Sequence, residues 1–305
     1  MIRHLRFLIL PVFAALLSAA PGRAADLAPY TLSPGVDLPL IGAGALMKIH
    51  SNRTLARTRN TPLDLHSVSR DDLHPMDRWA AGNYSPSLSS LSGGINWAIS
   101  AVPLLANGWD LYKGNQNWFG AATDLILLQE ALVISSSLVS YSKATLKLHP
   151  TPMVYEGSTA TEAEKLDSRN VSSFFSGHTT AAFTTAVFSA YTYQLKHQGS
   201  PLVPWVWGGS LAAASTVGGL RIAAGKHFPS DILAGAAVGA AVGYLVPRLH
   251  LRGGFFRSQE RATLASRGRL GREPRAEKPS RVDVDLGLAA VGGSTMPVPT
   301  LTLRF

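Results

Sequence analysis

The chain has 305 residues, of which 46% are hydrophobic and only 15% are charged, and it contains no cysteine. Soluble proteins typically have about 25% charged residues, so the composition favours a membrane protein, and the lack of cysteine excludes disulfides and thiolate metal sites. The 28 lysines and arginines outnumber the 19 acidic residues, which gives a formal charge of +9.

Residues 1–24 have the pattern of a signal peptide. A positively charged start, MIRHLRF, precedes the apolar stretch LILPVFAALLSAA, and small residues follow up to Ala24. The apolar stretch is too short to span a bilayer comfortably, so cleavage is expected after Ala24, with an uncleaved first helix as the alternative. Residues 25–91 are expected to form an N-terminal extramembrane or peripheral segment, with a peripheral helix at 36–50.

Five longer apolar segments then follow, at 94–111, 118–143, 178–195, 203–222 and 230–249. Each approaches the ~20 residues that a membrane-spanning helix needs. They predict an all-α bundle of five to six helices over residues 92–250, expected to be transmembrane. Small residues are frequent in these segments and also suit a tightly packed soluble bundle, which remains a rival. Asp124 and Glu130 are expected to face the bundle interior, in a structural role.

Residues 251–305 are predicted to be a basic linker followed by a small β-hairpin tail. Most of the charge of 251–281 is basic, which fits either a plain linker or a cytoplasmic flank facing anionic lipid. Apolar residues alternate from Val282 to Leu288, and again at Leu301 and Leu303, with a Gly-Gly pair between the two runs. This alternation indicates two strands, although Pro297 and Pro299 weaken the second.

The loop before the third apolar segment ends in SSFFSGHTTAAF. Ser173 or Ser176 can cap the helix that begins near His178. Gly177 leaves the backbone N–H groups of that terminus open to an approaching ligand, and such a terminus binds anions. His178 therefore stands where it can donate a proton to a bound phosphate ester.

A second chemical pattern, RIAAGKHFPSD, connects the fourth and fifth segments. Arg221 offers a planar fork for phosphate oxygens. Asp231 lies four residues after His227, where its carboxylate can fix the tautomer of the imidazole and leave the other nitrogen free to attack phosphorus. Antiparallel crossings bring this connector, His178 and the end of the second segment near Lys143 to one side of the bundle.

These motifs, SGHT at 176–179 and R-x5-H-x3-D at 221–231, resemble the type 2 phosphatidic acid phosphatase superfamily over about residues 75–250. The resemblance implies His227 as a nucleophile that forms a phosphohistidine, Asp231 as its orienting group and His178 as the proton donor. It also implies phosphate binding by Arg221, Ser176 and the Gly177 amide, and no metal or other cofactor.

The first motif of that family, K-x6-R-P, is poorly matched by YSKATLKLHPTPMVY. In the best alignment His149 and Thr151 stand where arginines are usual, and Pro152 matches the motif proline. Lys143 or Lys147 can replace the motif lysine as a phosphate-binding cation. Losing a charged hydrogen bond costs about 1.5–3 kcal/mol, so a weakened phosphatase is expected.

The sequence thus predicts a metal-independent phosphatase acting on a phosphomonoester or pyrophosphate, expected to be that of a lipid. It is placed in a bacterial inner membrane with the active site facing the periplasm. The rivals are a soluble periplasmic acid phosphatase, a vanadate-dependent haloperoxidase and a non-catalytic membrane protein that keeps the fold and binds a lipid headgroup. No nucleic-acid partner is expected, and the oligomeric state is left open.

Overall fold

The computed structural model describes residues 29–59, 63–146, 149–251, 282–291 and 294–303. The predicted signal peptide, Lys147 and almost all of the basic linker therefore lie outside the described residues. The chain divides into two compact units, 1–258 and 259–305. In the described part of the first unit the regular elements are helical, apart from one isolated bridge between Tyr30 and Leu251, which confirms the all-α expectation there.

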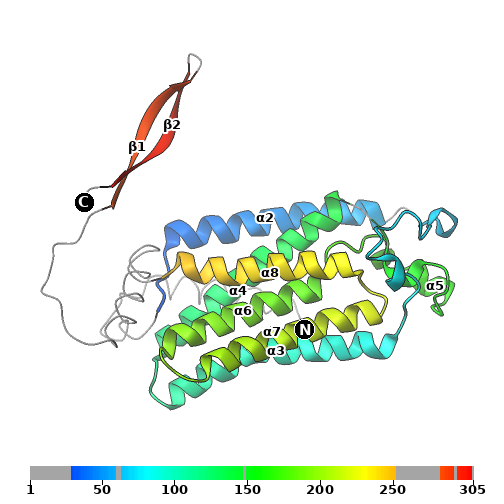
Figure 1. The fold of residues 1–305 in the computed structure, drawn as a ribbon, viewed down its shortest axis with the longest axis horizontal. Coiled ribbons are helices and arrows are strands. Elements are labelled where there is room, and N and C mark those ends of the chain that lie inside the picture. The colour runs from blue at the N-terminus through cyan, green and yellow to red at the C-terminus, as the bar shows by residue number, and fades with distance from the viewer. Residues whose placement is uncertain (1–28, 60–62, 147–148, 252–281, 292–293, 304–305) are drawn as a thin grey trace, which may run out of the picture. The chain divides into compact units, whose positions relative to one another are not determined.

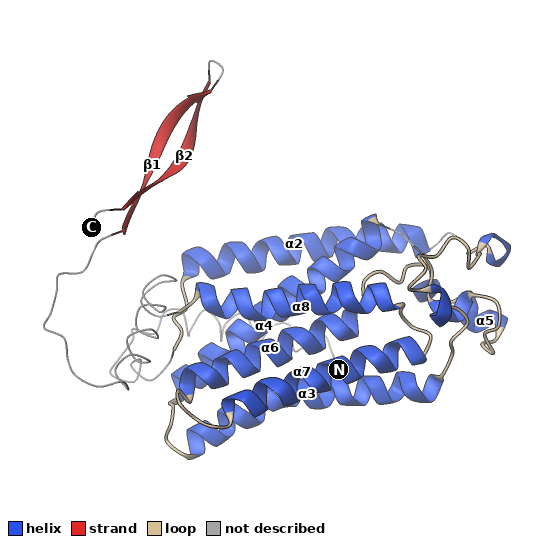
Figure 2. Cartoon of the chain, viewed as in Figure 1, coloured by secondary structure: helices blue, strands red, loops and turns tan. Residues whose placement is uncertain are grey.

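Six long helices build the described part of the first unit (Figures 1 and 2). They are α2 (Pro34–Arg59), α3 (Pro86–Tyr112), α4 (Trp118–Thr145), α6 (Gly177–Lys196), α7 (Val203–Ala223) and α8 (Pro229–Leu249). The shorter helices, α5 (Glu162–Lys165), η2 (Leu65–Ser67), η3 (Arg78–Ala80), η4 (Pro152–Val154) and η5 (Ser168–Asn170), lie in the connections. The last five long helices coincide with the five apolar segments, and α2 is longer than the expected peripheral helix.

Local sequence sets where these helices begin. Ser85 caps α3 by accepting from the backbone N–H of Leu88, and Pro86 follows at the first helical position, where its missing N–H costs nothing. The Asn117 side chain caps α4 by accepting from the Gly120 N–H at 2.8 Å. Such caps satisfy backbone donors that the helix itself leaves unpaired, so these boundaries are readable from the sequence.

Three of the helices, α3, α4 and α8, are long and apolar enough to cross a membrane. Helix α3 is the most exposed of them: Trp97 is 78% and Leu105 72% exposed. Large apolar side chains on a surface mark contact with lipid or protein. The fold therefore has the character of a membrane protein.

Close backbone packing joins α6 to α8. A Cβ added to Gly239 would lie 2.4 Å from the Thr180 carbonyl oxygen, and one added to Gly243 would lie 2.4 Å from that of Thr184. One turn earlier, a Cβ on Gly235 would meet the Ser176 carbonyl oxygen at 2.9 Å. This stripe of glycines lets the two helices that carry the SGHT and histidine–aspartate motifs approach each other closely.

The second unit contains β1 (Val282–Val291) and β2 (Ser294–Leu303), which pair antiparallel with Val282 opposite Leu303 and Val291 opposite Ser294. A two-stranded hairpin on its own is marginally stable at best in water. The C-terminal hairpin therefore stays a prediction, and the site described below lies in the first unit.

Candidate active site

A cavity of about 640 Å³ lies where α4 and α7 end and α6 begins. Five of the predicted site residues line it: Lys143, Gly177, His178, Arg221 and His227. Ser176 and Asp231 are fully buried beside it. The structure thus brings together residues that the sequence places up to 88 positions apart, while Lys147 lies outside the described residues.

The connector between α7 and α8 is held by its neighbours on both sides of His227. Gly225 has φ +68°, and a Cβ there would lie 1.7 Å from the Asn83 carbonyl oxygen, so only glycine fits this turn. Phe228 is fully buried in a cluster that includes Met153 and Tyr155. The Tyr155 ring meets the Phe228 ring edge-on at 5.6 Å between centroids. His227 therefore lies between a fixed turn and a fixed aromatic anchor.

His227 and Asp231 meet through a third residue, Ser173. The Nδ1 atom of His227 lies 3.2 Å from Ser173 Oγ and 3.4 Å from Asp231 Oδ2. The Ser173 hydroxyl itself donates to Asp231 Oδ2, which also accepts from the Phe228 N–H at 2.8 Å. Because the serine donates to the carboxylate, its oxygen can accept from His227 Nδ1–H. Nδ1 takes part in these hydrogen bonds, so Nε2 is the ring nitrogen that remains available to a ligand in the cavity.

Burial decides the charge of His227. The side chain is only 5% exposed, and this desolvation lowers its pKa to about 3, with Lys143 and Arg221 adding to the effect against the opposing influence of Asp231. The imidazole is consequently neutral at ordinary pH. A neutral imidazole keeps the lone pair that nucleophilic attack requires.

Arg221 points its guanidinium to both the cavity and α3. Its Nη1 donates to Ser89 Oγ at 3.1 Å and to Ser92 Oγ at 3.4 Å. Its Nε is buried and has no hydrogen-bond partner among the described residues. A buried donor of this kind is costly unless a ligand satisfies it, which is consistent with an anion-binding group.

The N-terminus of α6 has the geometry of an anion site. Of the two candidate caps, Ser176 occupies the N-cap position, where its Oγ accepts from the Thr179 N–H. Ser173 is used for the relay to Asp231 instead. The Ser176 N–H donates to the Asp231 carbonyl oxygen at 3.2 Å, which ties the start of α6 to the start of α8. Gly177 and His178 line the cavity at this terminus.

The region of the poorly matched first motif also reaches the site. Thr151 lines the cavity, and its buried hydroxyl has no hydrogen-bond partner among the described residues. His149 lies outside the lining, with Nε2 3.8 Å from Asp231 Oδ1 and its ring edge-on to Phe228. The position where an arginine is usual in the family is therefore next to the cavity, but a short neutral side chain occupies it.

Sequence reasoning missed several polar residues of this site. Ser173 was considered only as a helix cap, and the serines that hold Arg221 carried no signal at all. Lys226 and Arg169 also line the cavity, and Lys226 has a lowered pKa because it is partly buried. Lys226 directly precedes His227, so its position in the motif was the available signal.

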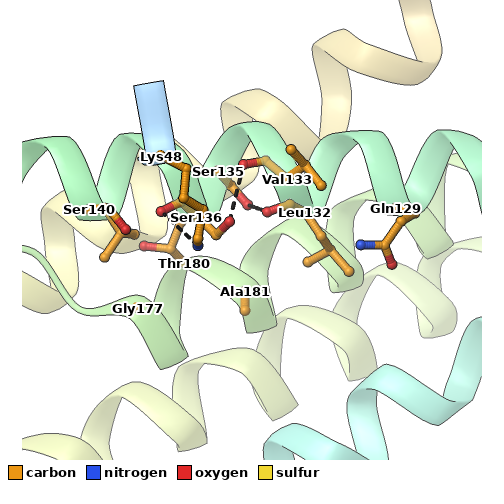
Figure 3. Close-up of a pocket in the computed structure, with 11 residues that line it drawn as sticks. Lys48, Gln129, Leu132, Val133, Ser135, Ser136, Ser140, Gly177, Thr180 and Ala181 are labelled. Atoms are coloured by element: carbon orange, nitrogen blue, oxygen red, sulfur yellow. Dashed lines mark hydrogen bonds between the residues drawn. The ribbon is translucent and has the colours of Figure 1, made fainter. Parts of the chain in front are cut away.

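A second cavity of about 420 Å³ adjoins the first at Gly177, which lines both. Figure 3 shows its lining of small polar and aliphatic side chains from α4 and α6, with Lys48 reaching in from α2. Lys48 Nζ donates to the Ser136 carbonyl oxygen at 3.5 Å. No titratable residue other than Lys48 lines this cavity among the described residues, so the chemistry belongs to the first cavity.

Two solved structures are similar to part of this chain. One is the crystal structure of the first transmembrane PAP2 type phosphatidylglycerolphosphate phosphatase from Bacillus subtilis, at 18% identity over 69% of this chain and 93% of that one, with a TM-score of 0.40. The other is that of Aquifex aeolicus LpxE, at 21% identity over 55% of this chain and 90% of that one, with a TM-score of 0.36. Curated proteins gave no match.

The PAP2 superfamily model matches residues 124–254. This segment contains α6, α7 and α8, and with them His178, Arg221, His227 and Asp231. The resemblance found in the two motifs is thereby confirmed by the family model, while the part of the cavity lining that lies between Tyr84 and Ser90 precedes the matched residues. Over residues 124–254, the chain is therefore similar to the PAP2 superfamily.

Proposed function

We propose that the protein is a phosphatase that hydrolyses a phosphate ester or pyrophosphate of a membrane lipid. The observation that carries the proposal is the single cavity lined by Lys143, His178, Arg221 and His227. These side chains combine cationic phosphate contacts with two imidazoles, which is the inventory needed for phosphoryl transfer to a histidine. The apolar helices α3, α4 and α8 support a substrate that is itself in the bilayer.

In the proposed reaction Nε2 of His227 attacks phosphorus, and the bond between phosphorus and the leaving oxygen breaks. The relay through Ser173 to Asp231 holds Nδ1–H and stabilises the positive charge that forms on the imidazole. His178 donates a proton to the leaving oxygen. Water then attacks the phosphohistidine and gives a proton to His178, and the bond between phosphorus and Nε2 breaks, which releases phosphate and regenerates both histidines.

Arg221 and the N–H groups at the start of α6 would hold the phosphoryl oxygens as negative charge develops on them. Arg221 would bind two phosphoryl oxygens through its unpartnered Nε and one Nη atom. The N-terminus of α6 would add its partial positive charge. These groups supply the charge stabilisation that a catalytic metal would otherwise give, so the proposed hydrolysis needs no metal. The active face is proposed to lie on the periplasmic side of an inner membrane.

A second candidate function, lipid-headgroup binding without turnover, is favoured by Thr151. A short hydroxyl side chain takes the place of a family arginine beside the cavity, and one charged contact is worth about 1.5–3 kcal/mol. A binding protein would keep Arg221 and the helix terminus and dispense with rapid hydrolysis. A soluble acid phosphatase would share the chemistry but would not require a membrane.

The decisive experiment is phosphate release by the purified full chain from a panel of lipid phosphates and water-soluble phosphomonoesters. Turnover of lipid phosphates, with loss in His227→Ala, is the expected result. Acid quench with labelled substrate should trap phosphate on the wild type but not on the variant. Equal release by His227→Ala would refute the assigned nucleophile, and lipid binding with no release by the wild type would favour the non-catalytic function.

A further inference from the structure

Three ionisable side chains that the proposed reaction does not use meet at a buried point of the first unit. Asp37 comes from the first turn of α2, Glu130 from α4, and His250 directly follows α8. Each offers a ligand atom, and these atoms all lie within 4.8 Å of one another. Asp37 is 0%, Glu130 1% and His250 3% exposed. Bulk water therefore does not solvate the charges of these side chains.

His250 is already oriented as a metal ligand would be. Its Nδ1 lies 2.8 Å from the Val246 carbonyl oxygen, which can only accept, so Nδ1 carries a proton. A histidine that donates one N–H to a backbone carbonyl presents its other nitrogen as a ligand of fixed direction. That nitrogen, Nε2, lies 2.5 Å from Asp37 Oδ1 and 4.0 Å from Glu130 Oε2.

Asp37 divides its two oxygens between the helix and the cluster. Oδ2 accepts from the Ser33 N–H at 2.6 Å, which closes the start of α2. Oδ1 faces His250. The local fold therefore fixes one carboxylate oxygen at the cluster, and it does so independently of Glu130.

Glu130 is the member of the cluster whose buried carboxylate is not stabilised by hydrogen bonds from the described residues. Neither of its carboxylate oxygens has a hydrogen-bond partner among the described residues, although the residue is almost fully buried. An unpaired buried carboxylate is costly, so a proton or a cation must compensate it. Once a metal ion displaces the proton that lies between His250 Nε2 and Asp37 Oδ1, two carboxylates and one neutral imidazole carry a charge of −2, which a divalent cation neutralises.

We propose that Asp37, Glu130 and His250 bind a divalent transition-metal ion, with Zn²⁺ as the best match. Zinc accepts a mixed set of imidazole and carboxylate ligands at about 2.0–2.2 Å, whereas Mg²⁺ prefers oxygen alone. The three ligand atoms lie within 4.8 Å of one another, so shifts of about 1 Å would let them surround such an ion.

The role of this ion is structural. His250 and Asp231 lie at opposite ends of α8, which puts the cluster about 30 Å from the candidate active site. The ion would fasten α2, which precedes the segment matched by the family model, to α4 and to the end of α8.

The test uses the purified full chain in detergent, stripped with a chelator and then equilibrated separately with Zn²⁺, Mn²⁺ and Mg²⁺. Metal retained per chain and the thermal unfolding temperature are measured for the wild type, Glu130→Gln and His250→Asn. One Zn²⁺ per chain and a rise in unfolding temperature are expected for the wild type. Each variant should lose at least about tenfold in zinc affinity. Both readouts are independent of phosphatase activity.

Glu130→Gln keeps the shape of the side chain and removes its charge, so the apo variant should fold at least as well as the apo wild type. The matched control is His197→Asn, because His197 also pairs with a carboxylate, Asp110, but lies outside the cluster. It should retain zinc. Absence of stoichiometric zinc in the wild type, equal zinc in Glu130→Gln, or stabilisation by Mg²⁺ but not by Zn²⁺ would each overturn the proposal.

Discussion

Ser173 is a residue of the candidate site that the tertiary structure reveals and the motifs do not. It joins His227 Nδ1 to Asp231 through one hydroxyl group. Ser173→Ala should lower kcat by about 10- to 100-fold with little change in KM, because a hydrogen bond to a charged group is worth about 1.5–3 kcal/mol and this one acts on the nucleophile. Steady-state kinetics on the best lipid substrate would measure the split.

Ser172→Ala is the matched control for this prediction. The adjacent Ser172 is also buried, but its hydroxyl donates to the Lys143 carbonyl oxygen at 3.2 Å and does not touch the histidine. Its loss should leave kcat within a few-fold of the wild type. If Ser173→Ala raised KM and spared kcat, the serine would be a binding residue and the relay described here would be wrong.

Thr151 gives the second prediction at this scale. Its unpartnered hydroxyl lines the cavity where the family usually has an arginine. If the other groups are aligned, Thr151→Arg should raise kcat/KM for simple phosphomonoesters by about tenfold, which needs only ~1.4 kcal/mol from a charge-assisted contact. Thr151→Met is the control, since it adds length without charge and should give no gain.

The opposite result has a definite meaning. If Lys143 already serves as the first-motif cation, the new arginine would crowd the cavity and activity should fall. Lys143→Ala would then be the damaging change. Should neither substitution alter phosphate release, the first motif has no catalytic role here, and headgroup binding without turnover becomes the better account.

Among the elements, the pair α6 and α8 controls the geometry of the site, because α6 begins at Gly177, directly before His178, and α8 begins at Pro229, two residues after His227. Gly239→Ala should destabilise the protein by about 1–3 kcal/mol, since its Cβ would lie 2.4 Å from the Thr180 carbonyl oxygen and force the helices apart. Thermal unfolding in detergent measures the loss.

Gly93→Ala in α3 is the matched control for the glycine stripe. A Cβ at Gly93 meets nothing within 4 Å, so alanine should be neutral or stabilise by about 0.5–1 kcal/mol through its better helix propensity. Equal loss in the two variants would mean that α6 and α8 are not closely packed at Gly239.

At the scale of the whole molecule, the prediction concerns insertion and orientation. The native chain has no cysteine, so single cysteines report on sidedness without background. Glu156 and Gln198 are exposed and lie near the two ends of α6, in the connections before and after it. With the site facing the periplasm, Glu156→Cys should react with a membrane-impermeant maleimide in intact cells, and Gln198→Cys only after permeabilisation.

The same cells test insertion itself. A protein anchored by apolar helices such as α3 stays with the membrane after an alkaline wash, because every backbone polar group is satisfied inside the helix. Release of the full chain by a detergent-free extraction would favour the soluble acid phosphatase. Labelling of both cysteines in intact cells would contradict the proposed topology.

The sequence by itself determined the long helices that follow α2 and the residue types gathered at the candidate site. The apolar segments delimit α3, α4, α6, α7 and α8, because helix length, caps and apolar runs are local properties of the chain. The histidines, Arg221 and Asp231 were predicted for a related reason. Each motif keeps its groups within a few residues, so spacing alone fixes which side chains can meet.

Only the tertiary structure decided how distant residues pair. Ser173 and His227 are 54 positions apart, and Asp37 and His250 are 213 apart. A serine or an aspartate in a loop or first helical turn carries no local signal that names its partner. The relay to Asp231 and the buried cluster at Glu130 exist because six helices close around them, and that closure is set by packing between elements, which no single stretch of sequence encodes.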